Sequence, residues 1–244
     1  MKAWPYPRYV AHRGAGKLAP ENTLAAMREG YRHGYRMVEF DVKLSADGVP
    51  FLLHDDTLDR TTDGAGRADA LNWGELARLD AGSWHSAAYA GEPLPTLSAI
   101  ARWAIANGVA CNIEIKPMPG RERDTGAVVA RETRALWRAA TVQPLLSSFA
   151  EDALAAARAA VPELPRALLV EDIPPDWQAR LARLGCAALD ADWRELDAQR
   201  VATGHDSGYW VLTYTANDPQ QVAQLAAWGV DAIITDAIDV VRPG

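Results

Sequence analysis

The feature that most constrains the fold is a repeated alternation of short apolar runs with segments of helical periodicity. Eight apolar runs lie near 9–12, 37–42, 110–116, 142–147, 166–170, 187–190, 209–214 and 231–235. Helical segments follow at 22–33, 96–107, 122–140, 150–160, 174–184, 195–203 and 218–228. This alternation is typical of βα units with parallel strands. Eight such units predict an α/β fold, a (β/α)8 TIM barrel. A doubly wound open sheet is the alternative, because periodicity does not reveal whether a sheet closes.

The chain is predicted to form a single domain over residues 1–244. Its 244 residues are 49% hydrophobic, which suffices for one large core, and no linker-like stretch divides them. One connection is much longer than an ordinary βα loop, because about 50 residues separate the second strand from the next long helix. We expect the part at about 56–95 to form a small insertion over one end of the barrel.

Charge and hydropathy exclude several classes of partner. The net charge of −7 argues against a nucleic acid or an anionic membrane as the ligand. The N-terminus has no apolar segment typical of a secretory signal, and no run of about 18 apolar residues predicts a membrane span. The sequence therefore predicts a cytoplasmic protein that binds a small molecule, and it leaves the oligomeric state open.

Two acidic residues share one face of the second predicted strand. Glu39 and Asp41 are two positions apart, so their side chains point the same way. They are either a solvated strand end or ligands of a cation, because adjacent carboxylates repel each other. A hairpin at Asp47-Gly48 would bring a histidine to them. If that turn has two residues, Asp41 lies opposite His54, and a longer loop would shift this register by a residue or two.

The third predicted strand carries a second polar face. Asn112, Glu114 and Lys116 alternate with apolar residues, whereas a strand inside a barrel is usually apolar throughout. A buried carboxylate–lysine pair is one interpretation of this pattern. The other is a third carboxylate ligand beside an ammonium group that binds an anion. Three carboxylates provide only oxygen ligands, which favour Mg²⁺ or Ca²⁺ over zinc.

A histidine and an arginine follow the first predicted strand. His12 and Arg13 would lie at the carboxyl end of the barrel, where active sites of this fold are built. A histidine at a strand end often has only a structural role, but here the three carboxylates are expected at the same end. Arg13 adds a guanidinium suited to phosphate. His33 and His205 are expected at the surface, and His85 lies in the insertion without an obvious partner.

The motifs around these residues resemble those of the glycerophosphodiester phosphodiesterase family, among the phospholipase-C-like phosphodiesterase barrels. The similar segments are AHRGAGKLAPENT, VEFDVKLSADGVPFLLHDDTLDRTTDG, NIEIKP, LLSSF, VLTYTAND and GVDAIITD. They recur in family order over nearly the whole chain, and the last ones look most like short cytoplasmic bacterial members. Ala216 and Ala237 depart from the residues usual at their positions, and neither is a proposed ligand.

The resemblance implies metal-dependent hydrolysis of deacylated phospholipids to sn-glycerol 3-phosphate and an alcohol. By matching position, the catalytic acid and base are His12 and His54, and the metal ligands are Glu39, Asp41 and Glu114. Arg13 and Lys116 match phosphate-binding positions, and Tyr214 matches an aromatic position near the glycerol. Two alternatives remain at this point: a lysophospholipase D that uses the same machinery on a lipid, and a binding module without catalytic activity.

Overall fold

A closed barrel of parallel strands forms the centre of the molecule. The computed structural model describes residues 3–243. Within them the strands are β1 (Tyr9–Ala11), β2 (Met37–Leu44), β3 (Pro50–Leu52), β4 (Ala110–Ile115), β5 (Leu145–Ser148), β6 (Arg166–Val170), β7 (Ala188–Asp192), β8 (Trp210–Tyr214) and β9 (Ala232–Thr235). The order β1-β9-β8-β7-β6-β5-β4-β2 closes through a β1–β2 pairing, and β3 adds to β2 in antiparallel fashion. The fold is therefore the predicted TIM barrel with an insertion, and the open sheet is excluded.

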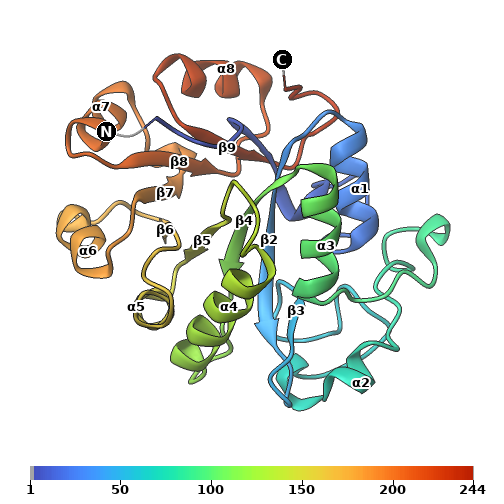
Figure 1. Ribbon diagram of the computed structural model, residues 1–244. Helices are drawn as coiled ribbons and strands as arrows, with labels where there is room; N and C mark the ends of the chain where they lie inside the picture. The colour runs from blue at the N-terminus through green and yellow to red at the C-terminus, as the bar shows by residue number, and fades with distance from the viewer. Residues whose placement is uncertain (1–2, 244) are drawn as a thin grey trace.

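Helices surround this barrel (Figure 1). They are α1 (Leu24–Arg32), α2 (Trp73–Leu76), α3 (Leu97–Asn107), α4 (Glu122–Leu136), α5 (Glu151–Ala160), α6 (Trp177–Leu184), α7 (Ala198–Asp206) and α8 (Pro219–Ala227). Every predicted long helix is present, with ends that differ by a few residues. The caps explain some of these ends. Asp218 accepts hydrogen bonds from the first backbone N–H groups of α8, and Pro219 occupies its first turn.

Apolar side chains pack on both sides of the barrel wall. Those pointing outward meet the helices, and those pointing inward fill the amino-terminal half of the barrel, including Val10, Met37, Leu145 and Leu212. Helices α4 and α5 approach closely at Gly126, where any side chain would collide with the carbonyl oxygen of Ala153. None of the helices between residues 3 and 243 is long and apolar enough to cross a membrane.

The long connection between β3 and α3 has a small core of its own. Residues 53–96 contain α2 and two 3-10 turns, η2 (Ala68–Ala70) and η3 (Ala87–Tyr89). Leu58, Leu76 and Leu94 are buried in one cluster with Phe51 of β3. In Figure 1 this segment projects to one side of the barrel, beside β3 and α3. Packing against β3 therefore fixes the insertion to the strand that leads into His54.

Candidate active site

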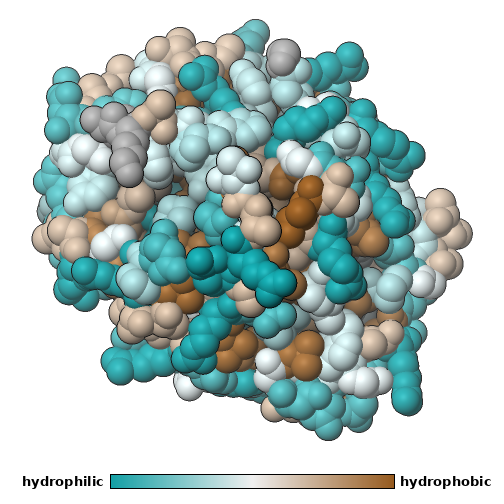
Figure 2. Space-filling view, viewed as in Figure 1, coloured by the Kyte–Doolittle hydropathy of each residue, from teal (hydrophilic) through white to brown (hydrophobic). Residues whose placement is uncertain are grey.

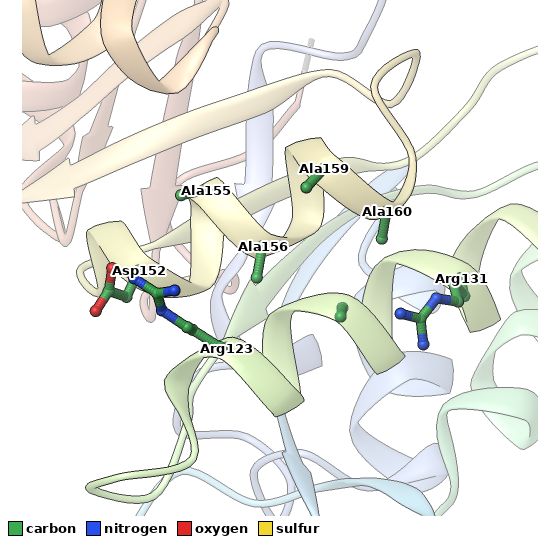
Figure 3. A pocket seen from close by; sticks show the side chains of 8 residues that line it. Arg123, Arg131, Asp152, Ala155, Ala156, Ala159 and Ala160 are labelled. Carbon is green, nitrogen blue, oxygen red and sulfur yellow. Dashed lines mark hydrogen bonds and ion pairs between the residues drawn. The ribbon is translucent and has the colours of Figure 1, made fainter.

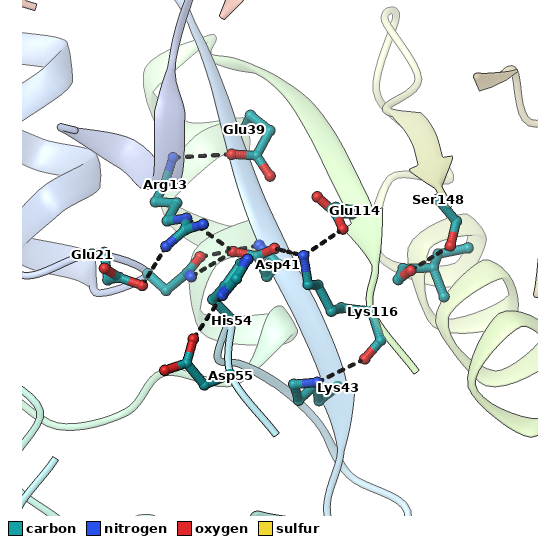
Figure 4. Close-up of polar contacts among 12 residues, drawn as sticks. Arg13, Glu21, Glu39, Asp41, Lys43, His54, Asp55, Glu114, Lys116 and Ser148 are labelled. Carbon is teal, nitrogen blue, oxygen red and sulfur yellow. Dashed lines mark hydrogen bonds and ion pairs between the residues drawn. The ribbon is translucent and has the colours of Figure 1, made fainter. Parts of the chain in front are cut away.

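Three carboxylates meet at the carboxyl end of β2 and β4 (Figure 4). Asp41 of β2 lies in register with Glu114 of β4, and Glu39 lies one inward position deeper on β2. Each offers an oxygen within 4.8 Å of the others, and none of the three residues is more than 9% exposed. The predicted set of ligands therefore converges, because parallel strands in register present equivalent positions side by side.

The electrostatics of this triad suit a bound cation. Burial first, and then the charges of Asp41 and Glu114, raise the pKa of Glu39 well above its ordinary value. Burial and the charge of Asp41 likewise raise the pKa of Glu114 to about 7. Oε1 of Glu39 is buried and has no hydrogen-bond partner among residues 3–243. A divalent cation would relieve this repulsion and satisfy that oxygen, so the residues fit a hard metal ion such as Mg²⁺ or Ca²⁺.

Two basic side chains flank the triad. Nζ of Lys116 lies 2.9 Å from Oε1 of Glu114 and 3.6 Å from Oδ1 of Asp41. Arg13 lies 3.5 Å from Oδ2 of Asp41 through Nε, and 2.8 Å from Glu21 through Nη1. Burial acts to raise the pKa of Asp41, but the charges of Arg13, Lys116 and His54 lower it to about 2. Asp41 is therefore the carboxylate of the triad that stays ionised at neutral pH.

His12 lies directly after β1 and is oriented by an aspartate. Its Nδ1 lies 2.6 Å from Oδ1 of Asp236, and its Nε2 lies 3.8 Å from Oε2 of Glu39. Asp236 follows β9, the strand that pairs with β1, so barrel closure brings the two residues together. Burial acts to raise the pKa of Asp236, and the hydrogen bond with His12 lowers it below its ordinary value. An ionised Asp236 accepts from Nδ1–H, which leaves Nε2 facing the triad.

The predicted pairing of Asp41 with His54 was wrong by one residue. Leu44 pairs with Pro50, and the N–H of Leu53 donates to the carbonyl of Asp41, so Leu53 lies opposite Asp41. The reason is a three-residue loop, in which Gly48 adopts a φ of 81°. His54 nevertheless reaches the site from the residue beyond Leu53, and Figure 4 shows its ring beside Asp41.

His54 has its own carboxylate partner within a charged network. Its Nδ1 lies 2.7 Å from Oδ1 of Asp55, and Arg60 of the insertion donates to both oxygens of Asp55. Arg60 also donates to Glu21, the partner of Arg13. Burial lowers the pKa of His54, and the charges of Arg13 and Lys116 lower it further, against the opposing effect of Asp41. A neutral imidazole therefore prevails at neutral pH, with Nδ1–H directed at Asp55.

Comparison with known proteins identifies the family. The profile of the glycerophosphoryl diester phosphodiesterase family matches residues 12–240. The chain belongs to this family. A glycerophosphodiester phosphodiesterase of Caldanaerobacter subterraneus is 30% identical over 247 residues, covering 96% of this chain and 98% of that protein. A glycerophosphodiester phosphodiesterase of Bacillus subtilis is 27% identical over 246 residues, 95% of this chain and 84% of the relative.

Solved structures of the family agree with this barrel. A phosphodiesterase of Oleispira antarctica, in complex with its product sn-glycerol-3-phosphate, has a TM-score of 0.90 and 38% identity, covering 97% of this chain and 95% of that one. A glycerophosphodiester phosphodiesterase of Agrobacterium tumefaciens has a TM-score of 0.80 and 26% identity, and the match covers 96% of this chain and 98% of that one. As a member of the glycerophosphoryl diester phosphodiesterase family, the chain is an enzyme, a phosphodiester hydrolase.

Tyr214, which the resemblance predicts to lie near the glycerol, is the last residue of β8. Its hydroxyl donates to the carbonyl of Val170 over 2.9 Å, and its ring meets that of Phe149 edge-on at 5.8 Å between centroids. Nζ of Lys116 lies 5.8 Å from the centroid of Phe149. Tyr214 therefore presents its ring rather than a free hydroxyl, on the catalytic side of the barrel.

Several residues of the site were not predicted as functional. Asn22 holds Asp41 twice, by donating to Oδ2 over 2.8 Å and by accepting from the backbone N–H over 3.0 Å. Lys43 is fully buried, and its Nζ contacts Asp56 over 2.9 Å and the carbonyl of Lys116 over 3.3 Å. Asp236 and Asp55 orient the two histidines. The sequence contained one usable signal, because Asp236 also follows a barrel strand at the catalytic end.

The outer layer of helices contains a hollow that lies away from this site. A hollow of about 470 Å³ between α4 and α5 is lined by alanines of α5 and by Arg123, Arg131 and Asp152 (Figure 3). It belongs to the outer layer of helices, and Arg123 already pairs with Asp152 at 3.4 Å.

His33 and His205, predicted at the surface, are partly exposed and pair with Glu29 and Asp231. His85 lies 3.0 Å from the carbonyl of Lys17.

Proposed function

We propose that the chain hydrolyses glycerophosphodiesters to sn-glycerol 3-phosphate and an alcohol, with a divalent cation and two histidines as acid and base. One observation carries the proposal. The acidic triad, the basic side chains of Arg13 and Lys116, and two histidines that are each oriented by an aspartate converge at one end of the barrel. The product bound to the Oleispira antarctica relative, sn-glycerol-3-phosphate, supports this substrate class.

The charge of the phosphodiester is the first obstacle to hydrolysis. A cation held by Glu39, Asp41 and Glu114 would provide positive charge next to the phosphate oxygens. Lys116 and Arg13 lie beside the same carboxylates, and their side chains are 23% and 19% exposed, so both can reach a substrate anion. Fixed positive groups stabilise the charge that grows on the phosphate oxygens in the transition state.

The two histidines divide the proton transfers. Asp236 and Asp55 each accept from one Nδ1–H, so both rings expose Nε2 to the substrate. One imidazole removes the proton of the nucleophile, and the other protonates the leaving alkoxide. Both histidines are partly exposed, with 19% and 29% of their side chains accessible.

The surface guides the choice between a water-soluble diester and a lipid. Figure 2 shows hydrophobic residues on the viewed face as separate patches among hydrophilic ones. Lipid substrates call for a broader exposed apolar surface. Among residues 3–243, the exposed large hydrophobic side chains are those of Trp84, Ile105, Val142, Phe149 and Val240, which come from five separate segments of the chain. We therefore favour the deacylated diester over a lysophospholipid.

The test compares glycerophosphocholine with a lysophosphatidylcholine as substrates of the metal-stripped and the reconstituted protein. We expect hydrolysis of the former only after Mg²⁺ or Ca²⁺ is restored. Full activity in EDTA would remove the metal from the mechanism, and preference for the lipid would reassign the substrate. No turnover of any diester by the reconstituted protein would favour a binding module instead.

A further inference from the structure

The barrel interior beside the acidic triad includes buried polar groups among its apolar side chains, although TIM-barrel interiors are usually filled by bulky apolar side chains alone. Asn112 of β4, Ser147 of β5 and Asp190 of β7 point inward, because side chains alternate along a strand. Their sequence neighbours pack outward against the helices: Cys111, Ile113, Leu146, Leu189 and Ala191. Three polar groups from three strands therefore face the barrel interior.

These groups are buried without protein partners. Asn112, Ser147 and Asp190 are each at most 1% exposed. Oδ1 of Asn112, Oγ of Ser147 and both carboxyl oxygens of Asp190 have no hydrogen-bond partner anywhere in residues 3–243. Buried polar groups in proteins are nearly always hydrogen-bonded, and where protein partners are lacking, ordered water provides the bonds. Four oxygens in one interior are enough to hold water in place.

The neighbouring inward positions leave room for such water. Between Ser147 and Asp190 lies β6, which places Ala167 opposite Ser147. Ala167 in turn pairs with Ala188, the inward residue that precedes Asp190 on β7. Alanine is far smaller than the branched residues usual at these positions, so Ala167 and Ala188 leave space beside Ser147 and beneath Asp190, whose own register neighbours are Leu169 and Leu212.

The polar cluster lies directly beside a metal ligand of the proposed site. Ser147 is in register with Glu114, and Asn112 precedes Glu114 on the same face of β4. Asp190 faces the same barrel interior from β7, and burial, followed by the charge of Glu114, raises its pKa well above its ordinary value. A hydrogen-bonded bridge from Asp190 would therefore end on the side of Glu114 that faces the barrel interior.

We propose that Asn112, Ser147 and Asp190 form an internal binding site for ordered water, through which Asp190 positions the carboxylate of Glu114. The water site stands by itself, whereas the positioning role rests on the proposed metal-dependent function. Partners that orient a metal ligand fix its geometry, and their removal typically weakens metal binding by about 10–100-fold. Asp190 is thus a positioning residue, and it makes no contact with the substrate.

A crystal structure at about 1.5 Å resolution of the protein and of two variants tests the water site. Asp190→Asn keeps the size of the side chain and its ability to form hydrogen bonds. Asp190→Leu keeps a similar size but cannot form hydrogen bonds. We expect water within hydrogen-bond distance of Asp190, Asn112 or Ser147 in the unsubstituted protein and in Asp190→Asn, but not in Asp190→Leu. An interior without water, in which protein groups bond these oxygens directly, would overturn the inference. Ser147→Ala serves if Asp190→Leu does not fold.

Titration with Mg²⁺ and with Ca²⁺ then tests the positioning role. Asp190→Leu should bind the cation about 10–100-fold more weakly, and Asp190→Asn should restore the affinity close to that of the unsubstituted protein. Equal affinities in all three proteins would refute the positioning role. Because neither readout uses catalysis, water bound in a protein that hydrolyses no diester would support this inference while refuting the proposed function.

Discussion

Glu114→Gln should stabilise the metal-free protein while removing a metal ligand. The pKa of Glu114 rises from the ordinary 4.5 to about 7 in the fold, chiefly through burial and the charge of Asp41. At 1.36 kcal/mol for each pKa unit, this rise means that ionised Glu114 destabilises the folded protein by about 3 kcal/mol. The folded protein binds the proton more tightly than the unfolded chain. This destabilisation is therefore absent below about pH 4.5, where Glu114 is protonated in both states, and it is complete once the pH has passed about 7.

Urea denaturation in EDTA at about pH 5 and about pH 8 measures this effect. Glutamine resembles the protonated carboxyl, so the variant should gain about 3 kcal/mol of unfolding free energy at pH 8 and under about 1 kcal/mol at pH 5. Excess cation should stabilise the unsubstituted protein, by about 2.7 kcal/mol at 100 times its dissociation constant, and the variant much less.

A matched control removes one carboxylate at the surface. Glu163→Gln breaks an exposed ion pair with Arg134, and we expect a change in unfolding free energy far smaller than that of Glu114→Gln at pH 8. If Glu114→Gln destabilised the metal-free protein at pH 8, or shifted its stability equally at both pH values, burial of an ionised carboxylate beside Asp41 would not be the cause.

Three further predictions concern the same site. Asp236→Asn should lower kcat by about 10²–10⁴-fold, because the amide no longer holds His12 with Nδ1–H toward its partner; unchanged kcat would contradict that role. Asn22→Ala should cost about 1–3 kcal/mol in chemical denaturation, because two hydrogen bonds to buried Asp41 are lost, and a cost near zero would count against them. Cation affinity should rise between about pH 6 and pH 8 as protons leave Glu114, and calorimetric titration that finds no pH dependence would refute proton competition.

The sequence predicted the βα units and the acidic triad because both follow from local periodicity, whereas the barrel was predicted from the number of these units. Alternate positions on two strands carry Glu39, Asp41 and Glu114. Because the two strands pair in register, these side chains lie next to one another. The partners of the histidines depend on more distant structure. Asp236 meets His12 only because the last strand closes the barrel against the first.

Loop conformation explains what else could not be predicted. Asn22 reaches Asp41 from a residue with a φ of 60°, in a turn that periodicity does not reveal. The register error at His54 arose from the left-handed conformation of Gly48, which Asp-Gly permits in both two- and three-residue loops. Arg60 lies 39 positions from Glu21, in an insertion without regular periodicity.

The central claim is that His12 and His54 act together as acid and base. Its most direct test is kcat/KM for glycerophosphocholine, measured with saturating cation, for His12→Ala, His54→Ala and the double variant. Each single substitution should lower the rate by about 10²–10⁴-fold, and the double variant should lose less than the product of the two losses, because the rings serve one reaction. A single variant that keeps more than about a tenth of the activity would contradict the paired mechanism.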